Sequence, residues 1–358
     1  MTYRIVHKTV YKYKSPVSVG NHVACLTPRS SPRYNCESHE LVITPPPAGV
    51  SHRPDFFGNL VTFFTIRQPH RELCIEARSR VVIDDAAVVW PERALPWDEA
   101  VRRLPTDLSP EGLDAYQFVF ESTRVRPGDE FADYAAESFP PGRPLTEALL
   151  DLTARIHKDF RFDAKATTVR TTPEEVLRLG RGVCQDFAQL QIACLRSLGL
   201  PARYVSGYLR TYPPPGRARL VGADVSHAWL SVYCPGTGWL DVDPTNNVIP
   251  SESHVTLSWG RDYATSVRSA ASFWAGVITP LTSAWIWNPV SFPITAIYLH
   301  ASLRYSLSTS STHTINSTSN RSAGIGRFWP RRRIVADHLT KKVWGHDHPR
   351  SRPAHLWV

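Results

Sequence analysis

Three residues in the second half of the chain have the side chains that thiol-dependent acyl transfer requires. Cys184 offers a sulfur nucleophile, and a thiol needs a base to become the reactive thiolate. His227 offers an imidazole that can take the thiol proton and return it to a leaving group. Asp243 offers a carboxylate that can orient this ring and stabilise its charged form. The sequence therefore predicts a Cys-His-Asp catalytic site, provided that the fold brings the three side chains together.

Cys184 stands at the start of a predicted helix. Between Gln185 and Leu198 apolar side chains recur at helical intervals, and Gly199 ends the pattern. The first turn of a helix has unpaired amides and the positive end of the dipole, which favour a thiolate and can hold a developing oxyanion. We therefore expect the Cys184 thiol to be reactive.

A packing role is the alternative for a cysteine in or beside a helix. Cys194 lies in the middle of the same helix on its apolar face, so we expect it to pack in the core. Cys184 differs because Gly180 and Gly182 precede it, and we expect these glycines to let the backbone approach a substrate. This contrast favours a functional role for Cys184.

His227 and Asp243 lie on the two strands of a predicted antiparallel hairpin. Residues 224–233 alternate between apolar and polar side chains as a strand does, residues 234–238 form a turn, and residues 239–243 return as the partner strand. The hairpin thus carries the base and the carboxylate on neighbouring strands.

The register of this hairpin decides which carboxylate lies near His227. The register that we predict places Asp243 opposite Leu230 and Asp241 opposite Val232, with an uncertainty of about one or two residues. Asp243 is then the carboxylate nearer to the imidazole, and Asp241 is the reserve candidate.

Other segments have patterns typical of the elements that would position these residues. Leu145–Phe160 has apolar residues on one face and predicts an amphipathic helix. Thr172 and Glu175 form a capping box for a second helix that ends near Leu179. From Tyr3 to about Val82, short runs of β-branched and aromatic residues between Pro and Gly clusters predict the strands of a sandwich.

Around these residues the sequence resembles the transglutaminase-like superfamily, in particular its bacterial members with a β-rich N-terminal region. The resemblance rests on three blocks in the order that the family has, which are Arg181–Ala188 around the cysteine, Ser226–Trp229 around the histidine and Gly238–Asn246 around the aspartate. The N-terminal stretch adds Leu26–Arg29 and Asp55–Asn59, so that the likeness extends from residue 1 to about residue 264.

The resemblance implies an α+β fold in three parts. A β-sandwich-like N-terminal region would occupy residues 1–85, and a papain-like transglutaminase core, in which the Cys184 helix packs on an antiparallel sheet bearing His227 and Asp243, would occupy residues 86–264. An irregular tail would follow at 265–358. The implied activity is that of a cysteine peptidase or transglutaminase-like acyltransferase. It would cleave amide bonds of peptides, proteins or peptide-like polymers through a thioester, which water or an amine resolves. We expect no cofactor and no metal.

The C-terminal tail differs in composition from the rest of the chain. The formal charge of +9 comes wholly from residues 264–358, and residues 306–322 are dominated by Ser, Thr and Asn. We expect a replaced or out-of-frame end that is disordered.

Two functional alternatives for the tail lack support in the sequence. Residues 269–299 have no charge, but prolines would interrupt a membrane-spanning helix, and the basic cluster at 331–342 has no nucleic-acid reading motif. We therefore expect neither a membrane nor a specific nucleic-acid partner.

The cysteine pattern and the N-terminal residues indicate the cellular compartment in which we expect the protein. The six cysteines include no C-x-x-C pair, and the first residues show no apolar stretch of the kind a signal peptide has, so we expect reduced thiols and a cytoplasmic location.

Two other functions stay open on these data. One is a non-catalytic binding or scaffold module that retains the fold, and the other is a metal-dependent hydrolase with Cys184, His227 and Asp243 as ligands.

Overall fold

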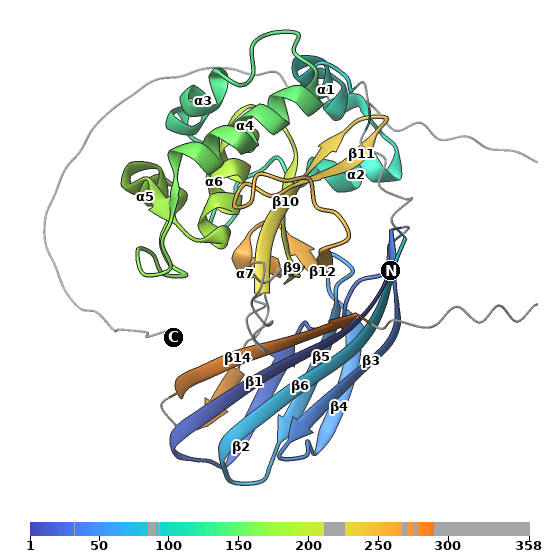
Figure 1. Cartoon of the computed structure of the whole chain (residues 1–358), viewed down its shortest axis with the longest axis vertical. Coiled ribbons are helices and arrows are strands. Elements are labelled where there is room, and N and C mark those ends of the chain that lie inside the picture. The colour runs from blue at the N-terminus through green and yellow to red at the C-terminus, as the bar shows by residue number, and fades with distance from the viewer. Residues whose placement is uncertain are drawn as a thin grey trace, which may run out of the picture. The chain divides into compact units, whose positions relative to one another are not determined.

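The structure is a computed structural model that describes residues 1–31, 33–84, 91, 94–210, 226–266, 271–274 and 278–289, the last two ranges for the backbone only. The chain divides into two compact units, Met1–Ile294 and Thr295–Val358, and the second lies outside the described residues. The first unit combines a β-rich N-terminal region with a mixed core of helices and strands, which confirms the predicted α+β class (Figure 1).

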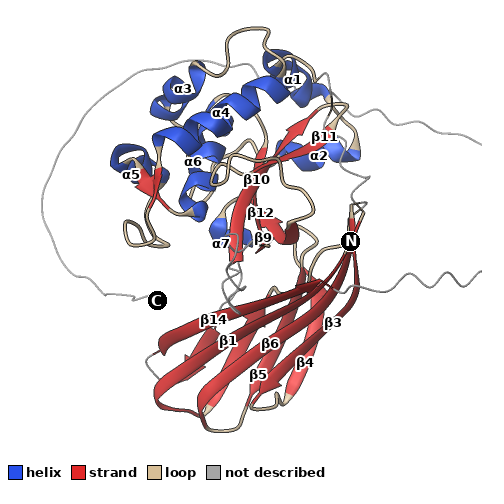
Figure 2. Cartoon of the chain, in the orientation of Figure 1, coloured by secondary structure: helices blue, strands red, loops and turns tan. Residues whose placement is uncertain are grey.

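The N-terminal region is built from two four-stranded antiparallel sheets, with strand orders β14-β1-β6-β3 and β13-β2-β5-β4 (Figure 2). Its first six strands are β1 (Thr2–Val17), β2 (Val19–Ala24), β3 (Tyr34–Thr44), β4 (Gly49–Pro54), β5 (Leu60–Ile66) and β6 (His70–Ile83). Leu73 and Ile75 of β6 pack with Phe64 and Ile66 of β5 in one apolar cluster between the sheets. Alternation of buried and exposed side chains along β6 is the pattern that such a half-buried strand requires.

Two strands lie in the segment for which the sequence predicts no stable fold. β13 (Ala271–Trp274) pairs with β2, and β14 (Ile278–Pro289) pairs with β1, both antiparallel. The prediction of a disordered tail therefore does not hold for these residues. The physical reason is that the segment is rich in β-branched and aromatic residues, and β1 and β2 each offer an edge to it. Residues 290–358 lie outside the described residues, as do the Ser/Thr-rich and basic stretches.

The core joins helices to a third antiparallel sheet, of strand order β11-β10-β9-β12. The sheet consists of β9 (Ala202–Leu209), β10 (Ser226–Cys234), β11 (Gly238–Val242) and β12 (His254–Gly260), and a short parallel pair is formed by β7 (Arg161–Phe162) and β8 (Arg181–Gly182). The helices are α1 (Trp97–Arg103), α2 (Pro110–Tyr116), α3 (Asp129–Ala136), α4 (Leu145–Asp159), α5 (Pro173–Leu179), α6 (Cys184–Ser197) and α7 (Tyr263–Ser266), with a 3-10 turn η2 (Leu104–Thr106). In the part of the chain that is described, no helix is both long and apolar enough to cross a bilayer.

Three helices confirm the sequence patterns. α4 follows the amphipathic stretch, and α5 begins with the predicted capping box between Thr172 and Glu175. α6 begins at Cys184 and ends one residue before the predicted end. α6 is buried on almost every side, because α3, α4 and α5 pack against it and β9 and β10 form the sheet beneath it. A helix held on all sides fixes the position of its first turn.

The turn Asp55–Asn59 links the N-terminal strands to β12 through hydrogen bonds. Oδ1 of Asp55 accepts hydrogen bonds from the backbone N–H groups of Phe57 and Asn59, both at 2.9 Å. The amide side chain of Asn59 then donates to the carbonyl of Trp259 at 2.8 Å and accepts from the Trp259 N–H at 3.0 Å. This pair of bonds explains why an Asp-x-x-Gly-Asn turn occurs here, since the amide of Asn59 substitutes for a strand partner of β12.

Candidate active site

Cys184 lies at the N-terminus of α6, where a carboxylate fixes the first turn. Oδ2 of Asp186 accepts hydrogen bonds from the backbone N–H of Val183 at 2.8 Å and from Oγ1 of Thr167 at 2.5 Å. The side chain of Cys184 is half-buried and packs against the main apolar cluster. The thiol therefore lies at the N-terminus of the helix, where the sequence predicts it.

The two glycines that precede Cys184 have structural causes other than the predicted approach of a substrate. Gly180 has a φ of +62° and ends α5, donating its N–H to the carbonyl of Val176 at 3.0 Å. A Cβ on Gly182 would lie only 2.7 Å from Oδ2 of Asp186. Helix termination and the close approach of Asp186 account for these glycines without a substrate.

The hairpin of β10 and β11 exists as predicted, but its register differs by one residue. Leu230 pairs with Val242 and not with Asp243, because the turn at residues 235–237 leaves Cys234 opposite Gly238. Directly opposed residues direct their side chains to the same face of a sheet. The observed register therefore directs the residue after Val242, which is Asp243, to the face that carries His227, whereas the predicted one would have directed it away.

His227 and Asp243 form a buried pair. Nε2 of His227 lies 2.7 Å from Oδ2 of Asp243, the histidine is 8% exposed, and the aspartate is fully buried. Burial alone lowers the pKa of His227, but hydrogen bonds and charges from Asp243 and Cys184 outweigh it and raise that pKa to about 10. Burial raises the pKa of Asp243, but hydrogen bonds from His227 and His254 hold it well below its usual range. The pair is therefore an imidazolium and a carboxylate at neutral pH.

Cys184 is the other partner of the His227 ring. A hydrogen bond with the Cys184 side chain is among the contributions that raise the pKa of His227. Because Nε2 is directed at Asp243, the ring nitrogen left for the sulfur is Nδ1. The structure thus brings together the three residues that the sequence singles out. Cys194 has a different environment, since full burial raises the pKa of its thiol to about 12 and keeps it protonated.

Asp243 accepts more hydrogen bonds than its pairing with His227 requires. Oδ1 accepts from the backbone N–H groups of Thr245 at 2.9 Å and Asn246 at 3.3 Å. Oδ2 also accepts from Nδ2 of Asn246 at 2.7 Å and from Nε2 of His254 at 3.2 Å. Five donors surround one buried carboxylate, which is the condition that keeps such a group ionised.

His254 is the member of this cluster that sequence reasoning missed. It is the first residue of β12 and is 4% exposed. The only local sign of it is an alternating stretch after the hairpin, from His254 to Gly260, which is compatible with a further strand. Its position beside Asp243 depends on the pairing of β12 with β9, which that stretch alone does not specify.

Three residues of this cluster have side chains that can ligate a metal ion. His227, Asp243 and His254 each offer one ligand atom, and these atoms lie within 4.8 Å of one another. Zinc bonds of about 2.0–2.2 Å in a tetrahedral site separate neighbouring ligand atoms by about 3.3 Å. The separation of 2.7 Å between Nε2 of His227 and Oδ2 of Asp243 is shorter and fits a charge-assisted hydrogen bond. The geometry favours a hydrogen-bonded cluster over a metal centre.

Asp241, the reserve carboxylate, contacts other groups. It accepts hydrogen bonds from Oγ of Ser231 and, at 3.5 Å, from Nε1 of Trp229. The buried Trp229 ring lies 6.2 Å from the His227 ring and meets the His254 ring edge-on at 5.2 Å, measured between centroids. Trp229 therefore forms an apolar wall behind both imidazoles, and Asp241 holds its indole in place.

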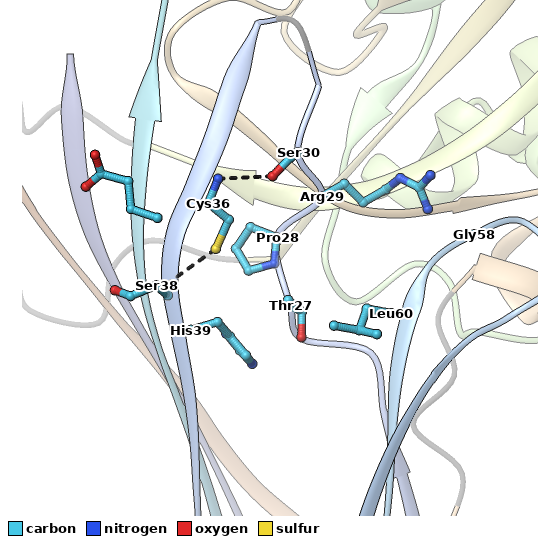
Figure 3. Close-up of a pocket in the computed structure, with 10 residues that line it drawn as sticks. Thr27, Pro28, Arg29, Ser30, Cys36, Ser38, His39, Gly58 and Leu60 are labelled. Atoms are coloured by element: carbon cyan, nitrogen blue, oxygen red, sulfur yellow. Dashed lines mark hydrogen bonds between the residues drawn. The ribbon is translucent and has the colours of Figure 1, made fainter. Parts of the chain in front are cut away.

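A separate pocket of about 400 Å³ lies at the end of the N-terminal strands (Figure 3). Thr27, Arg29, Cys36 and His39 are among the residues that line it, and the thiol of Cys36 donates to the carbonyl of Ser38 at 3.4 Å. None of its lining residues belongs to the cluster around Cys184. The pocket is thus distinct from the candidate active site.

Fold and site together define a class of protein. A helix begins at a cysteine and packs on an antiparallel sheet that carries a histidine and an aspartate, which is the α+β arrangement of papain-like thiol proteins. Residues 3–82 match the bacterial transglutaminase-like N-terminal region, and residues 132–244 match the transglutaminase-like superfamily. An uncharacterized protein of Mycobacterium tuberculosis is 42% identical over 272 residues, which cover 73% of this chain and 84% of that protein. The chain belongs to the transglutaminase-like superfamily.

Two further comparisons extend this result. A protein-glutamine gamma-glutamyltransferase of Pseudomonas aeruginosa is 29% identical over 161 residues, which cover 44% of this chain and 23% of that protein. The crystal structure of a proposed cysteine protease from Cytophaga hutchinsonii matches with a TM-score of 0.58 and 19% identity, covering 80% of this chain and 98% of that one. At that identity the structural match bears on the fold alone.

Proposed function

We propose that this chain is a thiol-dependent enzyme that hydrolyses amide bonds or transfers their acyl groups, and that its substrates are glutamine side chains of peptides or proteins. The observation that carries the proposal is the buried His227–Asp243 pair at 2.7 Å, with Cys184 as the other hydrogen-bond partner of the imidazole. A binding module has no need for a charged imidazole held between a carboxylate and a thiol.

The reaction would proceed in two halves. With His227 in its imidazolium form, the proton of Cys184 already resides on the ring, and the Cys184 thiolate attacks the amide carbon, so that a C–S bond forms while the negative charge collects on the carbonyl oxygen. His227 then protonates the departing nitrogen, the C–N bond breaks, and a thioester remains on the sulfur. Water or an amine next attacks the thioester while His227 accepts its proton, the C–S bond breaks, and the Cys184 thiolate is released beside the imidazolium. Asp243 stabilises the imidazolium at each of these steps.

The substrate class follows from the relative in Pseudomonas aeruginosa, whose name states a γ-glutamyl transfer from protein glutamine. The same thioester chemistry serves a hydrolase and a transferase, since they differ only in the acceptor. The superfamily and the site support both outcomes, and the proposal therefore includes both.

The direct test is a trapped acyl adduct. Purified full-length chain is mixed with a glutamine-containing peptide, quenched in acid within milliseconds to seconds, and examined by peptide mass spectrometry. We expect an adduct on Cys184 whose mass equals that of the peptide minus ammonia. In the absence of peptide, iodoacetamide should alkylate Cys184 before the other five cysteines.

Matched variants separate this function from a non-catalytic role. Cys184→Ser should abolish ammonia release, whereas Cys74→Ser, which alters a half-buried cysteine in β6, should leave it unchanged. Ammonia release that survives Cys184→Ser would refute the proposed nucleophile. If the wild-type chain forms no adduct with any glutamine peptide and its Cys184 reacts no faster than Cys74, the chain is a non-catalytic member of the superfamily.

A further inference from the structure

Oδ2 of Asp243 is shared by two imidazoles. His227 approaches it at 2.7 Å from β10, and His254 approaches it at 3.2 Å from β12. The two rings are 6.0 Å apart between centroids and both are buried, so that no bulk water competes for this oxygen. A second buried imidazole on the same carboxylate oxygen is more than the proposed reaction strictly needs.

The hydrogen-bond pattern fixes the direction of the second contact. Asp243 is ionised and can only accept, so His254 must donate through Nε2. Among the described residues, Nδ1 of His254 has no hydrogen-bond partner. A buried ring nitrogen that lacks a hydrogen-bond partner costs less free energy as a lone pair than as the N–H group of a charged ring. The neutral tautomer with its proton on Nε2 therefore fits this position.

The sheet brings His254 to Asp243 through a glycine on the strand between them. Gly207 of β9 pairs with His227 on one side and with Thr256 on the other. A Cβ at Gly207 would lie 2.2 Å from the carbonyl oxygen of Val255 and 2.4 Å from the Trp229 ring. Because Gly207 has no side chain, β12 and Trp229 can pack closely against β9. This close packing determines the position of the His254 ring.

We propose that His254 is a positioning residue, which donates to Oδ2 of Asp243 and holds that carboxylate in the orientation that His227 requires. The inference rests on the proposed function, because it assigns a role in that reaction. His254 touches neither Cys184 nor a reacting atom in this arrangement. It acts through Asp243, and Asn246 is its co-donor on the same oxygen.

Geometry also predicts how substitutions at this position should rank. Leu has a similar volume to His but no donor, so His254→Leu leaves Asp243 with one fewer hydrogen bond and freedom to turn. Gln carries an N–H group at nearly the reach of Nε2, so His254→Gln retains the donor. Hydrogen bonds to charged groups are typically worth enough to change a rate about 10-fold or more when they act on a catalytic orientation.

The experiment uses the full-length chain with a glutamine-containing peptide. We expect His254→Leu to lower kcat about 10-fold with KM within about twofold of wild type, and His254→Gln to stay within about threefold of wild type in kcat. Rates are expressed per folded chain, with the folded fraction measured by urea titration, so that an unfolded fraction does not contribute. His70→Leu is the control, since His70 is also buried, has one hydrogen-bonded ring nitrogen and lies in β6.

The outcomes separate this inference from the proposed function. If wild-type chain forms no adduct on Cys184, the proposed function fails before His254 is tested. If wild type is active and His254→Leu retains full kcat per folded chain, the positioning role is wrong. Should His254→Leu not fold, His254→Asn replaces it, because its amide is too short to reach Asp243. Equal kcat values for the Asn and Gln variants would then overturn the inference.

Discussion

Replacement of Asp243 by Asn should switch the His227 ring from charged to neutral. The ordinary pKa of a histidine is 6.5 and that of His227 is about 10, which corresponds to about 5 kcal/mol in favour of the imidazolium. Burial opposes this charge, and Asp243 is the main group that overcomes it. Without the carboxylate, we expect the pKa to fall by about 3, or about 4 kcal/mol, to near or below the ordinary value.

NMR titration of the His227 ring and the pH dependence of Cys184 alkylation measure this change together. In wild type, the imidazolium should persist to about pH 10, and the thiol should be alkylated rapidly at neutral pH. In Asp243→Asn, the ring should titrate near or below pH 7, and alkylation at pH 7 should slow by at least about 10-fold, because the thiolate loses its charged partner.

Asp241→Asn supplies the control, since it alters a carboxylate on the same hairpin that hydrogen-bonds Ser231 and Trp229. That variant should leave the titration of His227 within about half a pH unit of wild type. The reasoning is refuted if Asp243→Asn leaves the His227 titration unchanged, or if both variants shift it equally.

Three other substitutions follow from the same structure. His227 contributes fully to stability below pH 6.5 and loses that contribution as the pH rises through about 10, so the free energy of unfolding should fall across this range in wild type and much less in His227→Gln, as measured by urea titration. Gly207→Ala should destabilise the fold by about 1–3 kcal/mol, because the new methyl group meets Val255 and Trp229, and thermal unfolding would detect it. Thr172→Ala should cost about 1 kcal/mol in urea unfolding through loss of the α5 cap, and a change below a few tenths would contradict the capping role.

The local part of the site could be predicted from sequence. The helix that begins at Cys184 and the capping box at Thr172 depend on residues within one or two turns, and both were predicted correctly. The existence of the His227 hairpin follows from alternation around a Gly-rich turn, which is also local. Its register was predicted one residue away, because the alternation fixes the faces of each strand but not the number of residues that the turn uses.

The tail strands and His254 show where local information ends. β13 and β14 pair with β2 and β1, from which more than two hundred residues separate them in sequence, and the overall composition of residues 265–358 indicated disorder in spite of the β-branched and aromatic residues of this segment. His254 reaches Asp243 only because β12 pairs with β9 and Gly207 leaves space between the strands. Neither pairing leaves a signature in the residues themselves.

Sequence by itself therefore determined the residues of the candidate site, the helix that begins at Cys184 and the superfamily to which the chain belongs. Tertiary structure decided which face Asp243 occupies, which second histidine shares its carboxylate and how strongly His227 is charged. The physical reason is range: helix caps and dipoles act over a few residues, whereas burial, strand pairing and the sharing of a buried carboxylate depend on groups that only the folded chain brings together.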